Sequence, residues 1–392
     1  MIQMIVSVEE IIKLIKGDIT KKEEDLLRRS FNFAEKAHEG QKRLSGDPYF
    51  LHVYETAKIL AELGMDIQTI SAGFLHDVLE DTNVKEEEMI KEFGEDIVLL
   101  VKGVTKLGTL KYRGHERHVE SLRKFFVAMT NDLRVVIIKL ADRLHNLRTL
   151  KYVREDKQKR IALESLEVYA PLANRLGMSE LKGIIEDTAF PYVYPEESKS
   201  IDEMIENRKD MYKKYLEEIR DTLETELVKN KIKSLEINYR IKHRYSLWKK
   251  LKRYDMDIDK IYDIVALRVI VKNIETCYRV LGIVHSIWKP LPGRIKDYIA
   301  VPKPNGYRSI HTTIFTGSGG VAEIQIRTEE MHVEAAYGIA AHFAYKESRK
   351  KNHAEEDKSK YKWIEELKDF NHELNNPQKY LENLKTDFFN DR

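Results

Sequence analysis

The chain of 392 residues is long enough for two or three domains with separate hydrophobic cores. Its 67 Lys and Arg residues nearly balance its 65 Asp and Glu residues, so the net charge does not indicate a nucleic-acid-binding protein, and any basic site must be local. The single cysteine, Cys277, excludes an intrachain disulfide and favours a reducing, cytoplasmic compartment. The short apolar runs and the N-terminal segment predict neither a membrane span nor a secretion signal.

An all-α domain is predicted for residues 1–195. Apolar residues recur there with helical spacing, and short breaks containing Gly, Asn or Asp separate the segments. Pro191 and Pro195 mark the end of this domain. The predicted helices cover residues 23–40, 49–64, 72–82, 86–107, 118–132 and 133–150.

The second half of the chain combines strands and helices. We predict a charged helical connector at 196–232, an α/β or α+β domain at 233–346 and a charged helical tail at 347–392. The Pro- and Gly-rich segment that starts at Leu291 predicts a loop. Short β-branched segments predict strands at 234–242, 262–271, 308–316 and 320–328, and helices are predicted near 245–253, 275–288 and 329–346.

The apolar stretch AGFLHDVLEDT carries His76, Asp77, Glu80 and Asp81. Burial of an unpaired charge is costly, so this helix needs a reason for its carboxylates. On one helix, His76 lies a turn from Glu80, and Asp77 lies a turn from Asp81. A divalent cation and its water between these side chains would account for them.

Two further predicted helices supply ligands for the same cation. His52 lies among apolar residues, and Asp142, His145 and Asn146 share one helix face. Mixed imidazole and carboxylate ligands suit Mn, Fe, Co or Zn better than Ca. Taken alone, His52 is more simply a buried core histidine, but the combined set favours a metal site over ordinary core and surface residues.

A basic run at 231–253 contains nine Lys or Arg residues and one Glu. Arg240 and Lys242 lie on a predicted strand, and Ser246 and Lys250 lie on the helix that follows. Helix N-terminal amides add to this charge, so the run predicts a polyphosphate site. A solvated or RNA-facing basic surface is the alternative.

Two carboxylates favour the polyphosphate interpretation. Asp263 and Glu323 lie on separate predicted strands, and magnesium binds one or two carboxylates together with substrate phosphates. The Pro- and Gly-rich segment adds cations and Tyr307, which could stack on a base. This combination predicts a Mg²⁺-nucleotide site.

Several long motifs resemble the N-terminal catalytic half of long RelA/SpoT homologues, the (p)ppGpp synthetase/hydrolases of the stringent response. The similarity covers roughly residues 20 to 350, and its motifs read HEGQKRLSGDPYFLH, GFLHDVLEDT, GVTKL, KLADRLHNLRTL, YAPLANRLGM, GRIKDYIAVPKPNGYRSIHTT, EIQIRTEEMH and AAHFAYK. The resemblance implies an HD-type phosphohydrolase domain followed by a nucleotidyltransferase-like synthetase domain with a mixed sheet. Family members continue into a TGS domain, so the chain is expected to be a fragment, with the ribosome and uncharged tRNA acting through domains beyond it.

The resemblance implies a hydrolase site in the helical domain. Mn²⁺ would be held there by His52, His76, Asp77 and Asp142, while Glu80 and Asp81 would activate the water that releases pyrophosphate from the 3′ position of (p)ppGpp. The nucleotide would be contacted by Arg43, Ser45 and Asn146.

The resemblance also implies a synthetase that moves pyrophosphate from ATP to the 3′-hydroxyl of GDP or GTP. Asp263 would bind Mg²⁺, and Glu323 would orient that metal and act as the base. Arg240 and Arg268 would sandwich adenine, and Tyr307 would stack on guanine. The ATP phosphates would be held by Lys242, Ser246 and Lys250, with Lys296, Lys303, Asn305, His311 and Gln325 nearby.

The segment RIKD, from Arg294 to Asp297, is the basic version that the family's bifunctional members carry, so both activities are expected. Leu44 replaces a cation that many members have in the hydrolase pocket, and Val53 replaces a common Pro.

We hypothesise that the connector couples two states of the chain, and that only one of the two sites is competent in each state. A ligand at either site would then weaken ligand binding at the other site. Calorimetric titration of one ligand against the other measures this coupling.

Two other functions are consistent with parts of the sequence. One is a non-enzymatic or RNA-facing module in which the HD domain is degenerate, but the intact ligand set argues against it. The other is a nucleotidyltransferase/phosphohydrolase that acts on RNA ends. Formation of AMP from ATP and GDP supports the synthetase, whereas tRNA-dependent incorporation of AMP supports this alternative.

Overall fold

The computed structural model describes residues 6–15, 17–108, 128, 132–261, 263–316 and 320–341. These residues form two compact units, one built from residues up to Ala173 together with Ile339 onward, and one from Asn174 to Gly338. The predicted helix at 118–132 lies outside the described residues except at its end, as does the predicted tail at 347–392. None of the helices in these ranges is both long and apolar enough to cross a bilayer.

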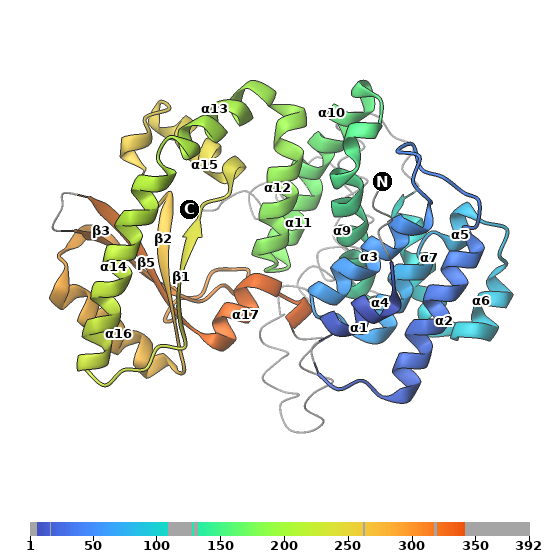
Figure 1. The fold of residues 1–392 in the computed structure, drawn as a ribbon, viewed down its shortest axis with the longest axis horizontal. Coiled ribbons are helices and arrows are strands. Elements are labelled where there is room, and N and C mark those ends of the chain that lie inside the picture. The colour runs from blue at the N-terminus through green and yellow to red at the C-terminus, as the bar shows by residue number, and fades with distance from the viewer. Residues whose placement is uncertain are drawn as a thin grey trace, which may run out of the picture. The chain divides into compact units, whose positions relative to one another are not determined.

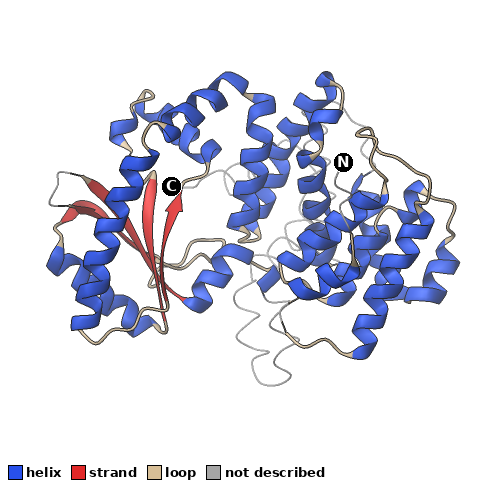
Figure 2. Cartoon of the chain, viewed as in Figure 1, coloured by secondary structure: helices blue, strands red, loops and turns tan. Residues whose placement is uncertain are grey.

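The first unit is helical, as its sequence periodicity predicts (Figures 1 and 2). Side-chain caps start several of its helices, including a capping box between Thr20 and Glu23 and a cap from Asp66. Its helices are α1 (Val8–Leu14), α2 (Lys21–Ala37), α3 (Phe50–Glu62), α4 (Ile67–Leu75), α5 (Val78–Asp81), α6 (Glu86–Phe93), α7 (Glu95–Gly108), α9 (Leu133–Arg148), η1 (Leu150–Tyr152), α10 (Glu155–Glu164) and a π-helical turn (Ser165–Tyr169), with α11 (Ala170–Arg175) at the unit boundary.

Helices α3 and α4 approach closely because of a glycine. A Cβ on Gly73 would lie 2.5 Å from Leu60 Cδ1 and 3.3 Å from the Ala57 Cα, so a larger residue would push the helices apart.

The helix predicted at 72–82 is interrupted, since α4 ends at Leu75 and α5 starts at Val78. The His76 ring donates a hydrogen bond to the Gly73 carbonyl and competes with the backbone for that acceptor.

The second unit contains a five-stranded mixed sheet of order β1-β2-β5-β4-β3, in which only β2 and β5 are parallel. The strands are β1 (Glu236–Ile241), β2 (Val265–Val271), β3 (Pro290–Asp297), β4 (Ile310–Phe315) and β5 (Val321–Thr328). The helices are α12 (Ser179–Val193), α13 (Pro195–Glu206), α14 (Lys209–Lys229), α15 (Arg244–Leu251), η3 (Lys252–Tyr254), η4 (Ile258–Lys260), α16 (Ile274–Ile287) and α17 (Glu329–Tyr337).

The prediction of a loop from Leu291 onward is wrong for its first residues, which form strand β3. This strand pairs with β4 at the edge of the sheet, with an irregularity between Pro290 and Ile295. An edge strand tolerates proline because one row of its N–H groups needs no partner in the sheet. The four predicted strands are present.

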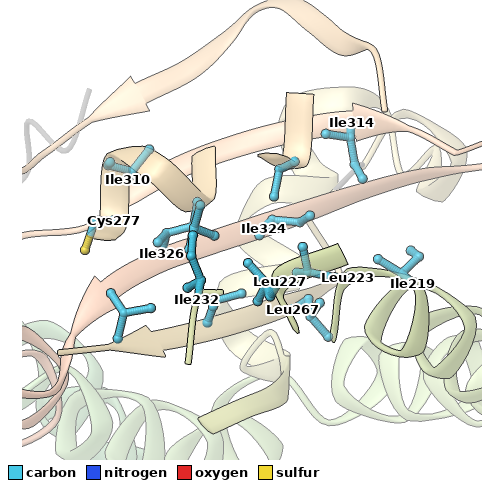
Figure 3. Packing of buried hydrophobic residues seen from close by; sticks show 14 of the residues in the cluster. Ile219, Leu223, Leu227, Ile232, Leu267, Cys277, Ile310, Ile314, Ile324 and Ile326 are labelled. Carbon is cyan, nitrogen blue, oxygen red and sulfur yellow. The ribbon is translucent and has the colours of Figure 1, made fainter. Parts of the chain in front are cut away.

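The limits of the second unit differ from those predicted at 195 and 232. Helix α12 packs against α13, α15 and α17. Ile219, Leu223 and Leu227 of α14 pack with strand residues such as Leu267 and Ile324 in one buried cluster (Figure 3). Helix α14, the longer part of the segment predicted as a connector, is therefore a layer of this unit, because its apolar stripe covers one face of the sheet.

Candidate functional site

The four predicted metal ligands of the first unit come together. His52 of α3 places Nε2 3.3 Å from Asp77 Oδ2 and 3.3 Å from Asp142 Oδ1. His76 Nε2 lies 3.3 Å from Asp77 Oδ1. Ligand atoms of His52, His76 and Asp142 lie within 4.8 Å of one another, which is an arrangement that could hold a divalent metal ion.

The hydrogen bonds of His76 test whether the residues fit a metal. A carbonyl can only accept, so the 2.8 Å bond to Gly73 places the ring proton on Nδ1 and the lone pair on Nε2. Within the described part of the chain, this buried Nε2 has no hydrogen-bond partner. A histidine that binds a metal through one ring nitrogen typically donates from the other to a backbone carbonyl or carboxylate, and His76 has this arrangement, so the donor set fits.

Neighbouring side chains hold the two carboxylates in place. Lys139 Nζ lies 2.7 Å from Asp142 Oδ2, and Asn146 donates to Asp142 Oδ1 at 2.5 Å. Burial opposes ionisation of Asp142, but Lys139 and the histidines outweigh it and lower its pKa. Tyr49 donates from its hydroxyl to Asp77 at 2.9 Å.

The two predicted water-activating acids lie on α5, beside this cluster. The single proton of the Tyr49 hydroxyl is shared between two carboxylates, since its oxygen lies 2.5 Å from Asp81 Oδ2 and 2.9 Å from Asp77 Oδ2. The residue Glu80 is exposed overall, but the loss of solvent around its carboxyl group and the nearby Asp77 carboxylate raise its pKa. A carboxylate with a raised pKa at the edge of a metal site is suited to accept a proton from water.

The predicted nucleotide contacts line a pocket that includes Asp142. Arg43 donates to Asn146 Oδ1 at 2.7 Å, and Ser45 lines the same pocket. The sequence interpretation did not include Lys139, Arg143 or Tyr152, which also line it. The spacing of Lys139 and Asp142 by three residues on one helix was the signal that could have found the lysine.

The second site lies on one face of the sheet in the other unit. In-register pairing places Arg240, Ala266, Glu323 and Thr313 in one row across β1, β2, β5 and β4. A second row holds Asn238, Arg268, Gln325, His311 and Lys296. Paired residues on neighbouring strands point to the same face, so these polar side chains share one face. The apolar cluster of Figure 3 belongs to the alternate positions.

Asp263 forms ion pairs with two lysines at the end of this face. Lys242 Nζ lies 2.6 Å from its Oδ2, and Lys250 Nζ lies 2.7 Å from its Oδ1. Burial opposes ionisation of Asp263, but the two lysines outweigh it and lower its pKa to about 2. The predicted phosphate-binding lysines and the predicted metal ligand are therefore neighbours.

Glu323 forms a chain with a histidine and a tyrosine. His311 Nδ1 lies 2.9 Å from Glu323 Oε1, and His311 Nε2 lies 2.8 Å from the Tyr307 hydroxyl. Gln325 donates to Glu323 Oε1 at 2.9 Å. Burial opposes ionisation of Glu323, but the bond with His311 outweighs it and lowers its pKa, so the carboxylate is ionised near neutral pH.

A pocket collects most of the predicted synthetase residues. Its lining includes Arg240, Lys242, Lys250, Asp263, Lys296, Lys303, His311, Glu323 and Gln325, together with Tyr254, Lys260, Arg294 and Tyr298. The described lining does not include Ser246, Arg268, Asn305 or Tyr307. Ser246 donates to Glu186, and Asn305 donates to the Asn174 carbonyl at 3.1 Å. Tyr254 and Lys260 were missed because they lie in the short 3-10 helices η3 and η4, and helices of three residues are too short to show a periodic pattern.

Residues 30–179 match a family model described as HD domain, and residues 239–350 match the region found in RelA/SpoT proteins. The first match lies mainly in the helical unit, and the second contains β2 to β5 and the end of β1 in the sheet unit. The chain belongs to the RelA/SpoT family. Membership accounts for the two sites, because each match contains one of them.

Three curated RelA/SpoT relatives match nearly all of the chain. It is 44% identical over 371 residues to a GTP pyrophosphokinase of Myxococcus xanthus (94% of this chain, 49% of that protein). It is 43% identical over 385 residues to a guanosine-3′,5′-bis(diphosphate) 3′-pyrophosphohydrolase of Aquifex aeolicus (98% and 54%). It is 42% identical over 388 residues to the bifunctional (p)ppGpp synthase/hydrolase SpoT of Escherichia coli K12 (98% and 54%). The chain spans about half the length of these relatives.

Proposed function

We propose that the chain carries two opposed activities, removal of the 3′-pyrophosphate from (p)ppGpp and transfer of pyrophosphate from ATP to the 3′-hydroxyl of GDP or GTP. The observation that carries this proposal is the presence of a complete polar site in each unit. His52, His76 and Asp142 converge in the HD domain, and Asp263 and Glu323 lie in a cationic pocket of the RelA/SpoT region. The names of the relatives support both activities.

The hydrolase would use a divalent ion, which we propose to be Mn²⁺, held by His52, His76, Asp77 and Asp142. When bound, such an ion supplies positive charge that acidifies water at neutral pH. Glu80 and Asp81 would hold the attacking water and take its proton. Arg43, Ser45 and Asn146 would orient the nucleotide so that the 3′-phosphorus faces this water.

The synthetase would use its lysines to orient ATP. Lys242 and Lys250 would bind the polyphosphate beside Asp263, where we propose that Mg²⁺ neutralises further charge. Glu323 would accept the proton as the 3′-hydroxyl oxygen bonds to the β-phosphorus of ATP. The bond between that phosphorus and the oxygen bridging to the α-phosphate breaks, and AMP leaves.

Two incubations test the two proposed activities, and tRNA added to the first tests the main alternative to the synthetase. With ATP, GDP and Mg²⁺, we expect AMP and a 3′-pyrophosphorylated guanine nucleotide in equal amounts. With (p)ppGpp and Mn²⁺, we expect pyrophosphate and GDP or GTP. AMP incorporation into added tRNA, without guanine-nucleotide product, would support action on RNA ends instead. We place these reactions in the cytoplasm, and we propose that the ribosome and uncharged tRNA act only through C-terminal domains outside this sequence.

Leu44 provides a prediction about the hydrolase pocket. Its side chain is 77% exposed and lines the pocket beside Arg43 and Ser45. Leu44→Lys should lower the KM for (p)ppGpp by about 1.4- to fivefold, because an exposed ion pair contributes about 0.2–1 kcal/mol. The gain should shrink at high salt. Leu44→Gln separates charge from size, and an equal gain with Gln would refute the electrostatic explanation.

A further inference from the structure

Helix α15, which carries Lys250, begins at Arg244 without a cap from its own N-cap residue. Within the described residues, His243 at the N-cap position makes no side-chain cap hydrogen bond. The first N–H groups of a helix have no intrahelical acceptor, so the first turn frays unless another group accepts from it.

Asp187 of α12 provides this cap from a different helix. Its Oδ1 accepts a hydrogen bond from the Tyr245 backbone N–H at 3.0 Å, and its Oδ2 lies 2.9 Å from His243 Nδ1. The Asp187 backbone carbonyl also accepts from the Arg244 guanidinium at 3.2 Å. A carboxylate at this position matches the positive end of the helix dipole as well.

Gly183, one turn before Asp187, allows this approach. A Cβ at that position would lie 2.1 Å from His243 Nε2 and within 2.4 Å of two further ring atoms. Any larger residue would displace the His243 ring from α12. The contact between α12 and the start of α15 therefore depends on the absence of a side chain at Gly183 as well as on the Asp187 carboxylate.

A second carboxylate strengthens the same contact. Glu186 is almost fully buried and accepts from Ser246 Oγ at 3.1 Å and from Lys249 Nζ at 3.0 Å. Together Glu186 and Asp187 hold three successive residues at the start of α15. The sequence analysis predicted that the N-terminal amides of this helix contribute to a phosphate site. One of these amides, the Tyr245 N–H, already donates to the Asp187 carboxylate.

The cap acts on the synthetase pocket through α15. Lys242 precedes the helix by two residues and Lys250 lies near its end, and both bind Asp263, at 2.6 and 2.7 Å. If the first turn frays, both lysines lose their fixed position relative to Asp263. A binding site that is ordered only part of the time shows an apparent affinity reduced by that fraction.

We propose that Asp187 is a positioning residue of the synthetase. It caps α15 from α12 and thereby holds Lys242 and Lys250 in the orientation that binds the polyphosphate of ATP. This inference rests on the proposed synthetase function, and it assigns a role to a residue that lines a different surface from the pocket itself.

Equilibrium binding tests the proposal without requiring turnover. The dissociation constant of α,β-methylene-ATP with Mg²⁺ is measured by calorimetry on the full chain and on three variants. Asp187→Ala removes the two carboxylate oxygens that contact Tyr245 and His243, and it should weaken binding of the analogue by about five- to tenfold. Asp187→Asn keeps an oxygen for the Tyr245 N–H and should return the dissociation constant to within about twofold of the parent. Asp202→Ala, which removes an exposed partner of Arg244 but not the cap, should leave it unchanged.

Each other outcome has a definite meaning. Equal affinity in Asp187→Ala and the parent overturns the positioning role, as does weakening in Asp202→Ala that matches Asp187→Ala. Loss of (p)ppGpp hydrolysis in Asp187→Ala along with loss of ATP binding indicates a general folding defect and also overturns it. A parent that binds the analogue but makes no AMP refutes the synthetase alone, whereas a parent that does not bind it refutes both.

Discussion

Replacing Glu323 with glutamine should lower the rate of pyrophosphate transfer by about 10²–10⁴-fold, because glutamine keeps the shape but cannot accept a proton. The carboxylate is buried, ionised and hydrogen-bonded to His311 at 2.9 Å, so it is held in place as a proton acceptor. The rate of AMP formation with saturating ATP and GDP measures the loss. Hydrolysis of (p)ppGpp should persist, since its proposed site lies in the other unit.

Glu275→Gln is the matched control, because Glu275 is an exposed carboxylate in the first turn of α16. This variant should retain transfer within about twofold, as most surface substitutions change energies by less than about 0.5 kcal/mol. If Glu323→Gln lowered transfer and hydrolysis together, the assignment of one activity to each unit would be wrong. Transfer at the parent rate would remove Glu323 from its proposed role.

Replacing His76 with alanine should abolish (p)ppGpp hydrolysis and remove the stabilisation that a divalent ion provides. A ligand present at 100 times its dissociation constant stabilises a folded protein by about 2.7 kcal/mol. The parent should therefore unfold at a higher temperature with Mn²⁺ than with a chelator, and His76→Ala should show little of this difference. Asp77→Ala should behave similarly, and pyrophosphate transfer should survive in both variants.

His285→Ala serves as the histidine control, because His285 lies in the sheet unit and pairs with Thr312. It should keep both the response to Mn²⁺ and hydrolysis. Undiminished hydrolysis by Asp77→Ala in metal-free buffer would contradict the metal site. A response to Mn²⁺ that survives in His76→Ala would place the ion elsewhere.

The sequence by itself determined which segments form helices or strands and which polar residues are candidates for the two sites. Helical periodicity identified the first unit, and β-branched segments identified β1, β2, β4 and β5, because these periods reflect local backbone geometry. The anomalous charges of AGFLHDVLEDT identified His76 and Asp77, since buried charge always requires a partner. Resemblance to the RelA/SpoT family then suggested a role for each side chain.

Only the tertiary structure decided which of these residues meet. Pairing across the sheet places Glu323 beside Thr313 and Ala266, and the helix that periodicity predicted as continuous is divided at His76 and Asp77. The cap of α15 comes from Asp187, 58 residues before the N–H that it binds. Such contacts depend on how whole elements pack, and local sequence periods carry no information about partners so far apart in the chain.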